Sequence, residues 1–438
     1  MRINLGAVAR VALLVTVAAI VGPSPGQAGG GGDDDDWVRT TGDILQIALP
    51  VLGGGSTFFT NPESGKRWDR DGTKQFAWAY GASWTTTYGL NLIFSKARPN
   101  GDNRTSFPSG HTMSAFAGAA FIDGRYGRTF GIPAYALAVF TGYSRVHSGW
   151  HYRDDVLAGA SIAMMYSWHF VSPQPGKISL LPTVSGQGLG MTLSVGGTGR
   201  DLDQEAEAEP RGSGYEFAFG PAFLISNQAA SLGDGGTVFE LGGLEGNNDP
   251  TTTASVTISL RAGAKGRVRL GWGPFEAKDR GAFSEDVVFG GETYAAGEPV
   301  ESQWRYYDAR GLYERVMLDS RDWGVSCGAG IGLAYSYAAL AAADTSRSSL
   351  VDDTVVYPYL MLGTNYRFSD RLSLGVSGAG ITWGNEWLLD AKLTLCWRVA
   401  RAWDFSIGYM YFTRQIETDT FYNKVRYSIP GFAMTRYW

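Results

Sequence analysis

The chain has 438 residues and a formal net charge of −5, with 18% charged and 44% hydrophobic residues. This length is expected to give about two or three domains, and the absence of a Lys/Arg excess argues against a nucleic-acid partner. The apolar content excludes a disordered chain, and two cysteines are too few for a disulfide scaffold.

Residues 1–28 have the pattern of a secretory signal peptide. Two arginines flank a short apolar segment, residues 11–21, and residues 26–28 supply the small side chains at which such a peptide is cleaved. The apolar segment is shorter than the roughly 20 residues that a membrane-spanning helix needs. We therefore predict export, followed by an acidic disordered leader over residues 29–39.

Residues 40–171 have the apolar spacing of helices. The spacing is clearest in four segments, which are residues 74–96, 109–122, 132–143 and 155–170. None of them offers an uncharged apolar run long enough to cross a membrane, so we predict an all-α helical bundle in the periplasm. Pro and Gly residues then predict a linker over residues 172–179.

Residues 180–438 change to a period of two, which is typical of β-strands with one apolar and one polar face. Residues 256–261 and 403–411 are examples. A soluble β-sandwich and a membrane barrel both use this pattern. Aromatic residues at the strand ends, and a last strand that ends in Trp438, favour an antiparallel transmembrane β-barrel. At about 10 residues per strand we predict about 12 strands, in a range of roughly 10 to 14.

The two cysteines fall on opposite faces in this pattern. Cys327 is in phase with apolar residues, whereas Cys396 is in phase with polar ones. Side chains on opposite faces of a barrel wall cannot reach disulfide geometry, so we predict two free thiols. A β-bulge that reverses the phase of one strand is the alternative.

Three polar blocks in the helical half carry the candidate chemistry: Arg98-Pro99, then Pro108-Ser109-Gly110-His111, then Ser144-Arg145 followed by His151 and Asp155. His151 and Asp155 lie four residues apart, on one face of a predicted helix start. A carboxylate at this spacing can hold the Nδ1 proton of the imidazole and leave Nε2 free to act as a nucleophile.

The remaining residues of the blocks suit a phosphoryl group. Arg98 and Arg145 offer planar guanidinium donors for phosphoryl oxygens. Ser109 and Gly110 open a predicted helix, whose first N–H groups can bind an anion. His111 lies beside that helix start and can protonate a leaving oxygen. Together the blocks predict in-line phosphoryl transfer without a metal or cofactor.

The pattern RP…PSGH…SRxxxxxHxxxD, over roughly residues 40–170, resembles the type 2 phosphatidic acid phosphatase (PAP2) and vanadium haloperoxidase superfamily. The resemblance implies a helical bundle with its site between the core helices. It also implies that His151 forms a phosphohistidine, that Asp155 orients it and that His111 serves the leaving group. The implied phosphate ligands are Arg98, Ser109, Gly110 and Arg145.

The sequence departs from the family at one position. The family usually has a Lys seven residues before the first-block Arg, where this chain has Asn91. Lys96 is a possible substitute, but a helix continuing to Arg98 would point it elsewhere, and weaker phosphate binding is the other possibility. His147 and His169 are predicted to be structural or exposed.

The leading hypothesis is a periplasm-facing phosphatase anchored in the outer membrane by its barrel, acting on lipid phosphates or soluble phosphomonoesters. One alternative is a haloperoxidase in which His151 binds vanadate as the cofactor. Another is a pore or structural barrel with an inactive helical domain. Four cationic residues fall on polar strand faces and would line its lumen: Arg267, Arg269, Lys392 and Arg398.

Overall fold

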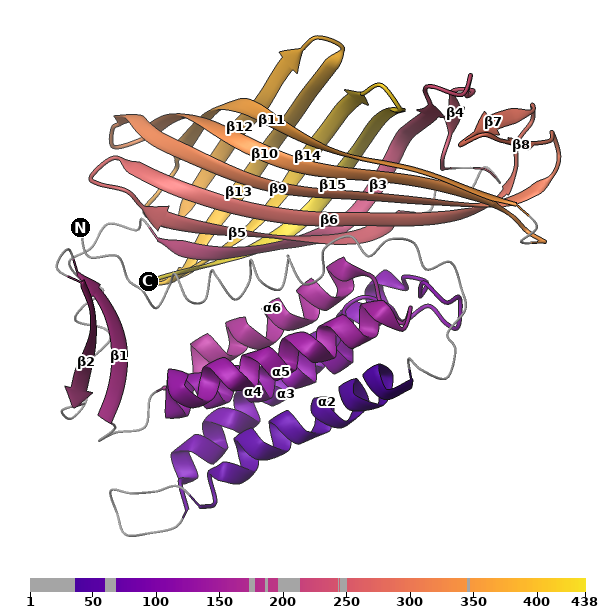
Figure 1. Ribbon diagram of the computed structural model, residues 1–438. Coiled ribbons are helices and arrows are strands. Elements are labelled where there is room, and N and C mark those ends of the chain that lie inside the picture. Colours follow the sequence, from indigo (N-terminus) through magenta and orange to yellow (C-terminus); the bar gives the residue numbers. More distant parts are fainter. Residues whose placement is uncertain are drawn as a thin grey trace. The chain divides into compact units, whose positions relative to one another are not determined.

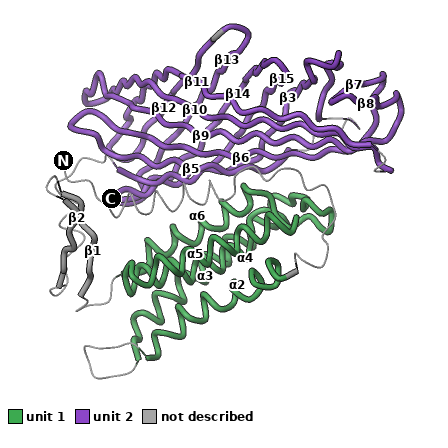
Figure 2. Tube along the Cα trace, viewed as in Figure 1, with its two compact units in different colours: residues 1–209 green, residues 210–438 purple. Residues whose placement is uncertain are grey.

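The computed structural model describes residues 36–59, 68–172, 178–185, 188–195, 213–242, 244, 250–344 and 347–438. The chain divides into two compact units, residues 1–209 and 210–438 (Figure 2). The predicted signal peptide, the acidic leader as far as residue 35 and most of the predicted linker lie outside the described residues.

The described part of the first unit contains a bundle of five helices (Figure 1): α2 (Asp36–Ser56), α3 (Arg70–Phe94), α4 (Gly110–Tyr126), α5 (Arg128–His147) and α6 (Arg153–Phe170). Helix α4 packs against each of the other four and forms the centre of the bundle. Gly118 permits one of these contacts, because a Cβ there would overlap the backbone of Leu49 on α2. The predicted helical bundle is therefore confirmed.

Two helix boundaries differ from the prediction. Helix α2 begins at Asp36, inside the segment predicted to be a disordered leader. Acidic residues favour a helix N-terminus electrostatically, so a run of aspartates can precede a helix directly. Helix α3 ends at Phe94, because Ser95 adopts a left-handed conformation with φ 39°. Lys96 therefore lies on a loop rather than on the predicted helix.

The outer faces of α2 and α3 are apolar. Ten exposed side chains on these helices are large and hydrophobic: Trp37, Ile44, Ile47, Val51, Leu52, Trp78, Trp84, Tyr88, Leu92 and Ile93. From Ile44 to Leu52, those of α2 recur with the spacing of one helix face, which places them on one stripe. Exposed apolar surface of this extent marks a site of interaction. Among the described residues, no helix has both the length and the apolar content needed to cross a membrane.

The second unit is a closed antiparallel β-barrel. Ten strands form it in the described residues: β3 (Gly214–Ser231), β5 (Thr251–Arg261), β6 (Gly266–Ala282), β9 (Pro299–Asp319), β10 (Trp323–Ala342), β11 (Ser348–Arg367), β12 (Leu372–Trp383), β13 (Glu386–Ala400), β14 (Trp403–Glu417) and β15 (Phe421–Tyr437). The barrel closes because β15 pairs with β3, from Phe421 opposite Ser231 to Tyr437 opposite Gly214. The predicted barrel is confirmed. It has ten strands rather than about 12 because several reach 20 or 21 residues.

The barrel begins at Gly214, later than the predicted start at residue 180. The hairpin of β1 (Ile178–Ser185) and β2 (Gly188–Val195) pairs only with itself and lies outside the barrel sheet. Alternating apolar and polar residues are shared by any half-buried strand, so the pattern does not tell which sheet a strand joins. The short strands β4 (Phe239–Glu240), β7 (Val287–Phe289) and β8 (Glu292–Tyr294) complete the unit.

Both cysteines are free, as predicted. Cys327 lies on β10 opposite Leu362, and Cys396 lies on β13 opposite Ser373 and Ser406. Two other strands, β11 and β12, separate them in the barrel wall.

Side chains cross the interior of the barrel. Arg310 on β9 donates to Asp308 at 2.7 Å and to Asp390 on β13 at 2.7 Å, and Tyr357 on β11 donates to Asp308 at 2.6 Å. Buried aromatic side chains adjoin this network, and they are Phe275, Trp304, Tyr306, Phe412 and Tyr427. A small barrel filled in this way has a packed core instead of an aqueous channel.

The cationic residues predicted to line the lumen are largely paired. Arg267 and Arg269 lie 3.3 and 3.7 Å from Glu314, and Arg398 lies 3.9 Å from Asp404. These ion pairs neutralise much of the charge on the inner face of the barrel.

Candidate active site

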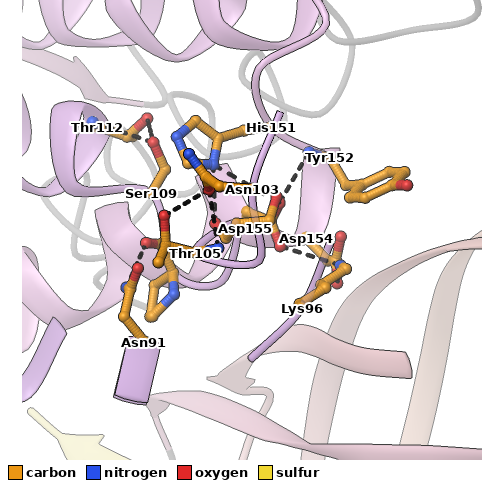
Figure 3. A network of polar contacts seen from close by, with 12 residues as sticks. Asn91, Lys96, Asn103, Thr105, Ser109, Thr112, His151, Tyr152, Asp154 and Asp155 are labelled. Carbon is orange, nitrogen blue, oxygen red and sulfur yellow. Dashed lines mark hydrogen bonds and ion pairs between the residues drawn. The ribbon is translucent and has the colours of Figure 1, made fainter. Parts of the chain in front are cut away.

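The second block of the motif forms the start of α4. Ser109 is the N-cap residue, and its buried Oγ accepts from the Thr112 N–H at 3.4 Å. The Ser109 N–H donates to the Asp155 carbonyl at 2.9 Å, and a Cβ at Gly159 would overlap the Ser109 carbonyl. Helix α6 therefore lies directly against the start of α4 (Figure 3). A Cβ at Gly110 would meet no atom within 4 Å, so the side of the first turn that this glycine faces is open.

The ring of His151 is buried and held by a backbone carbonyl. Its Nδ1 lies 2.8 Å from the Ser106 carbonyl oxygen and 3.7 Å from Asp155 Oδ2. A carbonyl can only accept, so Nδ1 carries the proton and Nε2 keeps its lone pair. The sequence predicts Asp155 in this orienting role, on a shared helix face. His151 precedes the first residue of α6, Arg153, so the two residues do not share a helix, yet the Asp155 carboxylate lies beside Nδ1 and His151 helps to lower its pKa.

Asp155 also connects several other parts of the site. It accepts from the Tyr152 N–H at 2.9 Å, from the Ser106 hydroxyl and from Lys96 Nζ at 3.0 Å (Figure 3). Lys96 also donates to Asp154 at 2.6 Å. Burial by itself would raise the pKa of Asp155, but Lys96 first, and then His151 and Ser106, lower it to about 2. Lys96 is thus the counter-ion of two buried carboxylates.

Burial of Lys96 would lower its pKa, but Asp154 and Asp155 outweigh this and raise the pKa above its ordinary value. Its ammonium group also lies 4.5 Å from the centre of the Tyr152 ring. Lys96 therefore does not replace the family Lys as a phosphate ligand.

The two motif arginines present guanidinium groups to the site. Arg98 stacks over Trp150 at 4.9 Å, and its buried Nε has no hydrogen-bond partner among the described residues. Arg145 donates from Nη1 to Asp43 at 2.7 Å and from Nη2 to the Arg39 carbonyl at 2.9 Å. Burial lowers the pKa of both arginines, yet a guanidinium remains charged at neutral pH.

His111 lies within reach of all these charges. Its Nε2 is 3.2 Å from Asp43 Oδ1. Burial, then Arg145, and then His151 and Arg98 lower the pKa of His111 to about 4, and Asp43 opposes them. Arg98, Arg145 and His151 lie close enough to the His111 imidazole to change its pKa. The three motif blocks therefore meet in a single site.

Asn91 contributes no charge where the family has a Lys. Its Nδ2 donates to the carbonyl oxygens of Thr87, at 2.9 Å, and Pro108, at 3.0 Å. It therefore braces the loop that leads into α4. His147 and His169 lie outside the cluster: His147 stacks on Tyr143 at 5.3 Å, and His169 is exposed next to Phe170.

Three contributors were absent from the sequence-based site: Asp43, the Ser106 carbonyl and Trp150. Asp43 and Ser106 lie outside the three motif blocks. Trp150 lies in the third block, but at a spacer position that the motif does not specify. The described residues contain no group of three or more His, Cys, Asp and Glu side chains arranged to hold a metal ion.

Comparison with known proteins agrees with this geometry. Residues 68–177 match the family model described as the PAP2 superfamily. This segment is a PAP2 superfamily domain. It contains α3 to α6 and all three motif blocks, whereas α2 and Asp43 precede it.

Two curated relatives resemble the PAP2 domain. A lipid A 1-phosphatase of Porphyromonas gingivalis is 39% identical over 75 residues, which are 16% of this chain and 17% of that protein. A lipid A 4'-phosphatase of Helicobacter pylori is 34% identical over 110 residues, which are 22% of this chain and 56% of that protein. The chain therefore spans only part of the length of either relative.

Solved structures resemble each unit distantly. LpxE of Aquifex aeolicus has 19% sequence identity and a TM-score of 0.27, and the match covers 36% of this chain and 92% of that one. The outer membrane protease OmpT of Escherichia coli has 8% identity and a TM-score of 0.37, over 53% of this chain and all of that one. These scores are too low to bear on function.

Proposed function

We propose that this protein is a phosphatase that hydrolyses lipid phosphates through a phosphohistidine intermediate, without a metal or cofactor. The observation that carries the proposal is the convergence of His111, His151, Arg98 and Arg145 at the start of α4. The hydrogen bond from His151 Nδ1 to a carbonyl leaves Nε2 as the free nucleophilic atom.

In the first step Nε2 of His151 attacks phosphorus, and the bond from phosphorus to the leaving oxygen breaks. The phosphoryl oxygens are held by Arg98, Arg145 and the first N–H groups of α4, whose charges stabilise the transition state. His111 transfers a proton to the leaving oxygen, so that an alcohol departs and His111 becomes neutral.

In the second step water attacks the phosphohistidine. His111 accepts a proton from the water as the new oxygen–phosphorus bond forms and the nitrogen–phosphorus bond breaks. Inorganic phosphate leaves and His151 returns to its starting tautomer. The low pKa of His111 in the phosphate-free site, about 4, suits a proton acceptor, and a bound phosphate dianion would favour its protonation.

The proposal places the barrel in the outer membrane and the PAP2 domain in the periplasm. The N–H of Trp438 donates to the Ser213 carbonyl at 3.3 Å, so the chain enters and leaves the barrel at one rim. The connections at that rim are short, such as residues 320–322 and 401–402, whereas residues 232–250 and 283–298 connect strands at the other. Short turns face the periplasm in bacterial outer-membrane barrels, which supports this orientation.

The apolar face of α3 supports lipid phosphates over soluble ones. Leu92 is 67% and Ile93 is 72% exposed, and they lie a few residues before Lys96 and Arg98. We expect Leu92→Ser/Ile93→Ser to lower turnover of a lipid phosphate in vesicles by about 10²-fold or more, because contact of these side chains with acyl chains contributes about 1.5–3 kcal/mol each. Turnover of a soluble phosphomonoester should change little.

The measurement is phosphate release by the full chain over a panel of lipid phosphates and soluble phosphomonoesters, with membrane fractionation of the expressed protein. Lys74→Ser on the exposed face of α3 is the matched control. Equal losses on both substrate classes would contradict the preference for lipids. Halide oxidation that requires vanadate and peroxide, without phosphate release, would support the haloperoxidase alternative instead.

A transport function is disfavoured by the filled interior of the barrel. We expect the full chain to give no stepwise ion conductance in planar bilayers, because the network of Arg310, Asp308 and Asp390 and the adjoining aromatic side chains occupy the lumen. A large general porin reconstituted in the same way serves as the positive control. Reproducible conductance steps would show that the lumen opens.

A further inference from the structure

Asp43 touches the candidate active site from outside the PAP2 domain. It lies on α2, and one oxygen, Oδ1, is 3.2 Å from His111 Nε2 and 2.7 Å from Arg145 Nη1. Its side chain is 39% exposed, so the contact lies on the accessible side of the cluster. No motif block contains it.

The packing of α2 is built for this approach. A Cβ at Gly42 would overlap the Ser144 hydroxyl and lie 2.8 Å from Arg145 Nη2, so only glycine lets α2 come this close. One turn away, the Arg39 carbonyl accepts from the same guanidinium at 2.9 Å. Two independent contacts therefore hold α2, and with it Asp43, against Arg145.

The charges around His111 show what Asp43 supplies. The groups that face the imidazole are Arg98 from the loop before α4, Arg145 from α5 and His151 from the loop before α6, with Asp43 from α2. Asp155, the other nearby carboxylate, is already paired with Lys96. Cationic neighbours disfavour an imidazolium, whereas a carboxylate at hydrogen-bond distance favours it. A general acid in such a site needs an anionic partner of its own.

We propose that Asp43 is a positioning residue for His111: its carboxylate accepts from Nε2–H, favours the imidazolium form that gives up a proton to the leaving oxygen, and fixes the ring beside the anion held by Arg145. The inference rests on the proposed phosphatase function and deepens it. In this role Asp43 acts through His111 on the leaving group. Its importance should therefore grow with the basicity of the leaving oxygen, because a poor leaving group depends on protonation and a good one does not.

The test compares Asp43→Asn with the unaltered full chain on two soluble substrates, an alkyl phosphate and p-nitrophenyl phosphate. We expect kcat for the alkyl phosphate to fall about 10²-fold, in line with the loss of general acid catalysis, and kcat for the aryl phosphate to fall less than about threefold. KM should change little for either substrate. Asp71→Asn, an identical exchange at an exposed carboxylate on α3, should leave both unchanged.

A second readout does not depend on turnover. The chain has only four histidines, so the imidazole of His111 can be followed by NMR in the full-length protein and assigned with His111→Asn. We expect Asp43→Asn to move the titration of His111 to lower pH. This shift tests the contact between the two residues even if the protein releases no phosphate, which would refute the proposed function separately.

Three results would overturn the inference. An unchanged titration of His111 would show that Asp43 does not support its proton. Equal losses on both substrates, with a raised KM, would assign Asp43 to phosphate binding through Arg145. A gain in activity would mean that the carboxylate competes with the substrate for Arg145.

Discussion

Replacing His151 with alanine is expected to abolish phosphate release from every substrate, with a fall in kcat of roughly 10³-fold or more. The substitution removes the atom that attacks phosphorus, and no other imidazole can take its place, because His111 is needed at the leaving oxygen. The measurement is phosphate release by the purified full chain in detergent. Denaturation in alkaline detergent during turnover should also trap a phosphorylated enzyme in the unaltered protein and none in the variant, because the nitrogen–phosphorus bond of a phosphohistidine is stable to alkali and labile to acid.

His147→Ala is the matched control. His147 stacks on Tyr143 and lies outside the cluster, so activity should stay within about threefold of the unaltered protein. Retained phosphate release in His151→Ala would refute the nucleophile assignment. A loss of equal size in both variants would indicate damage to the fold instead of loss of the nucleophile.

Replacing Lys96 with methionine is expected to destabilise the helical unit strongly and to reduce activity. The ammonium group neutralises Asp154 and Asp155, which are 1% and 0% exposed. Removal of one partner from a buried ion pair leaves uncompensated charge and costs about 3–5 kcal/mol. Asp155 would also hold the Ser106 loop less firmly, and that loop orients His151.

The pH dependence of this effect has a definite sign. In the unaltered protein the pKa of Asp155 is lowered to about 2, so its contribution to stability is complete above its unfolded pKa and is lost as the pH falls from about 4 to 2. The pKa of Lys96 is raised, so its contribution is present below about pH 10 and is lost at higher pH. In Lys96→Met the pKa of Asp155 rises, and acid unfolding should begin at a higher pH.

Thermal melting of the helical circular-dichroism signal of the full chain, measured between pH 3 and neutrality, would test this expectation. Lys74→Met on the exposed surface of α3 should melt like the unaltered protein. The double variant Lys96→Met/Asp154→Asn removes one of the two orphaned carboxylates and should recover part of the loss. If Lys96→Met melted at the same temperature and pH as the unaltered protein, Lys96 would not be the counter-ion of these carboxylates.

The residues of the candidate site were predictable in identity more than in role. Arg98, His111, Arg145 and His151 stand in motif blocks, and the structure brings them together. The hydrogen bond that orients His151 was not predictable, because its acceptor is a backbone carbonyl 45 residues away. A carbonyl oxygen belongs to every residue and leaves no signature in a sequence.

Lys96 shows how one local boundary changes a role. A helix from residue 74 through Lys96 would direct its side chain away from the site. Helix α3 ends instead at Phe94, and the left-handed Ser95 turns Lys96 toward Asp154 and Asp155. A left-handed conformation at a serine depends on the packing around it, so the periodicity of the preceding helix could not predict it.

The change from helical to strand periodicity and the identity of the motif residues could be read from the amino-acid sequence, since each depends on spacing between neighbours along the chain. That ten long strands close into a barrel and that side chains fill its lumen became clear only from the folded chain. The tertiary structure also decided that Asp43 of α2 meets His111 and Arg145. The contacts of Asp43 with His111 and Arg145 join residues about 70 and 102 positions apart, so they depend on how the helices pack. Gly42 permits this close approach, but a glycine in a sequence does not indicate which helix will pack against it.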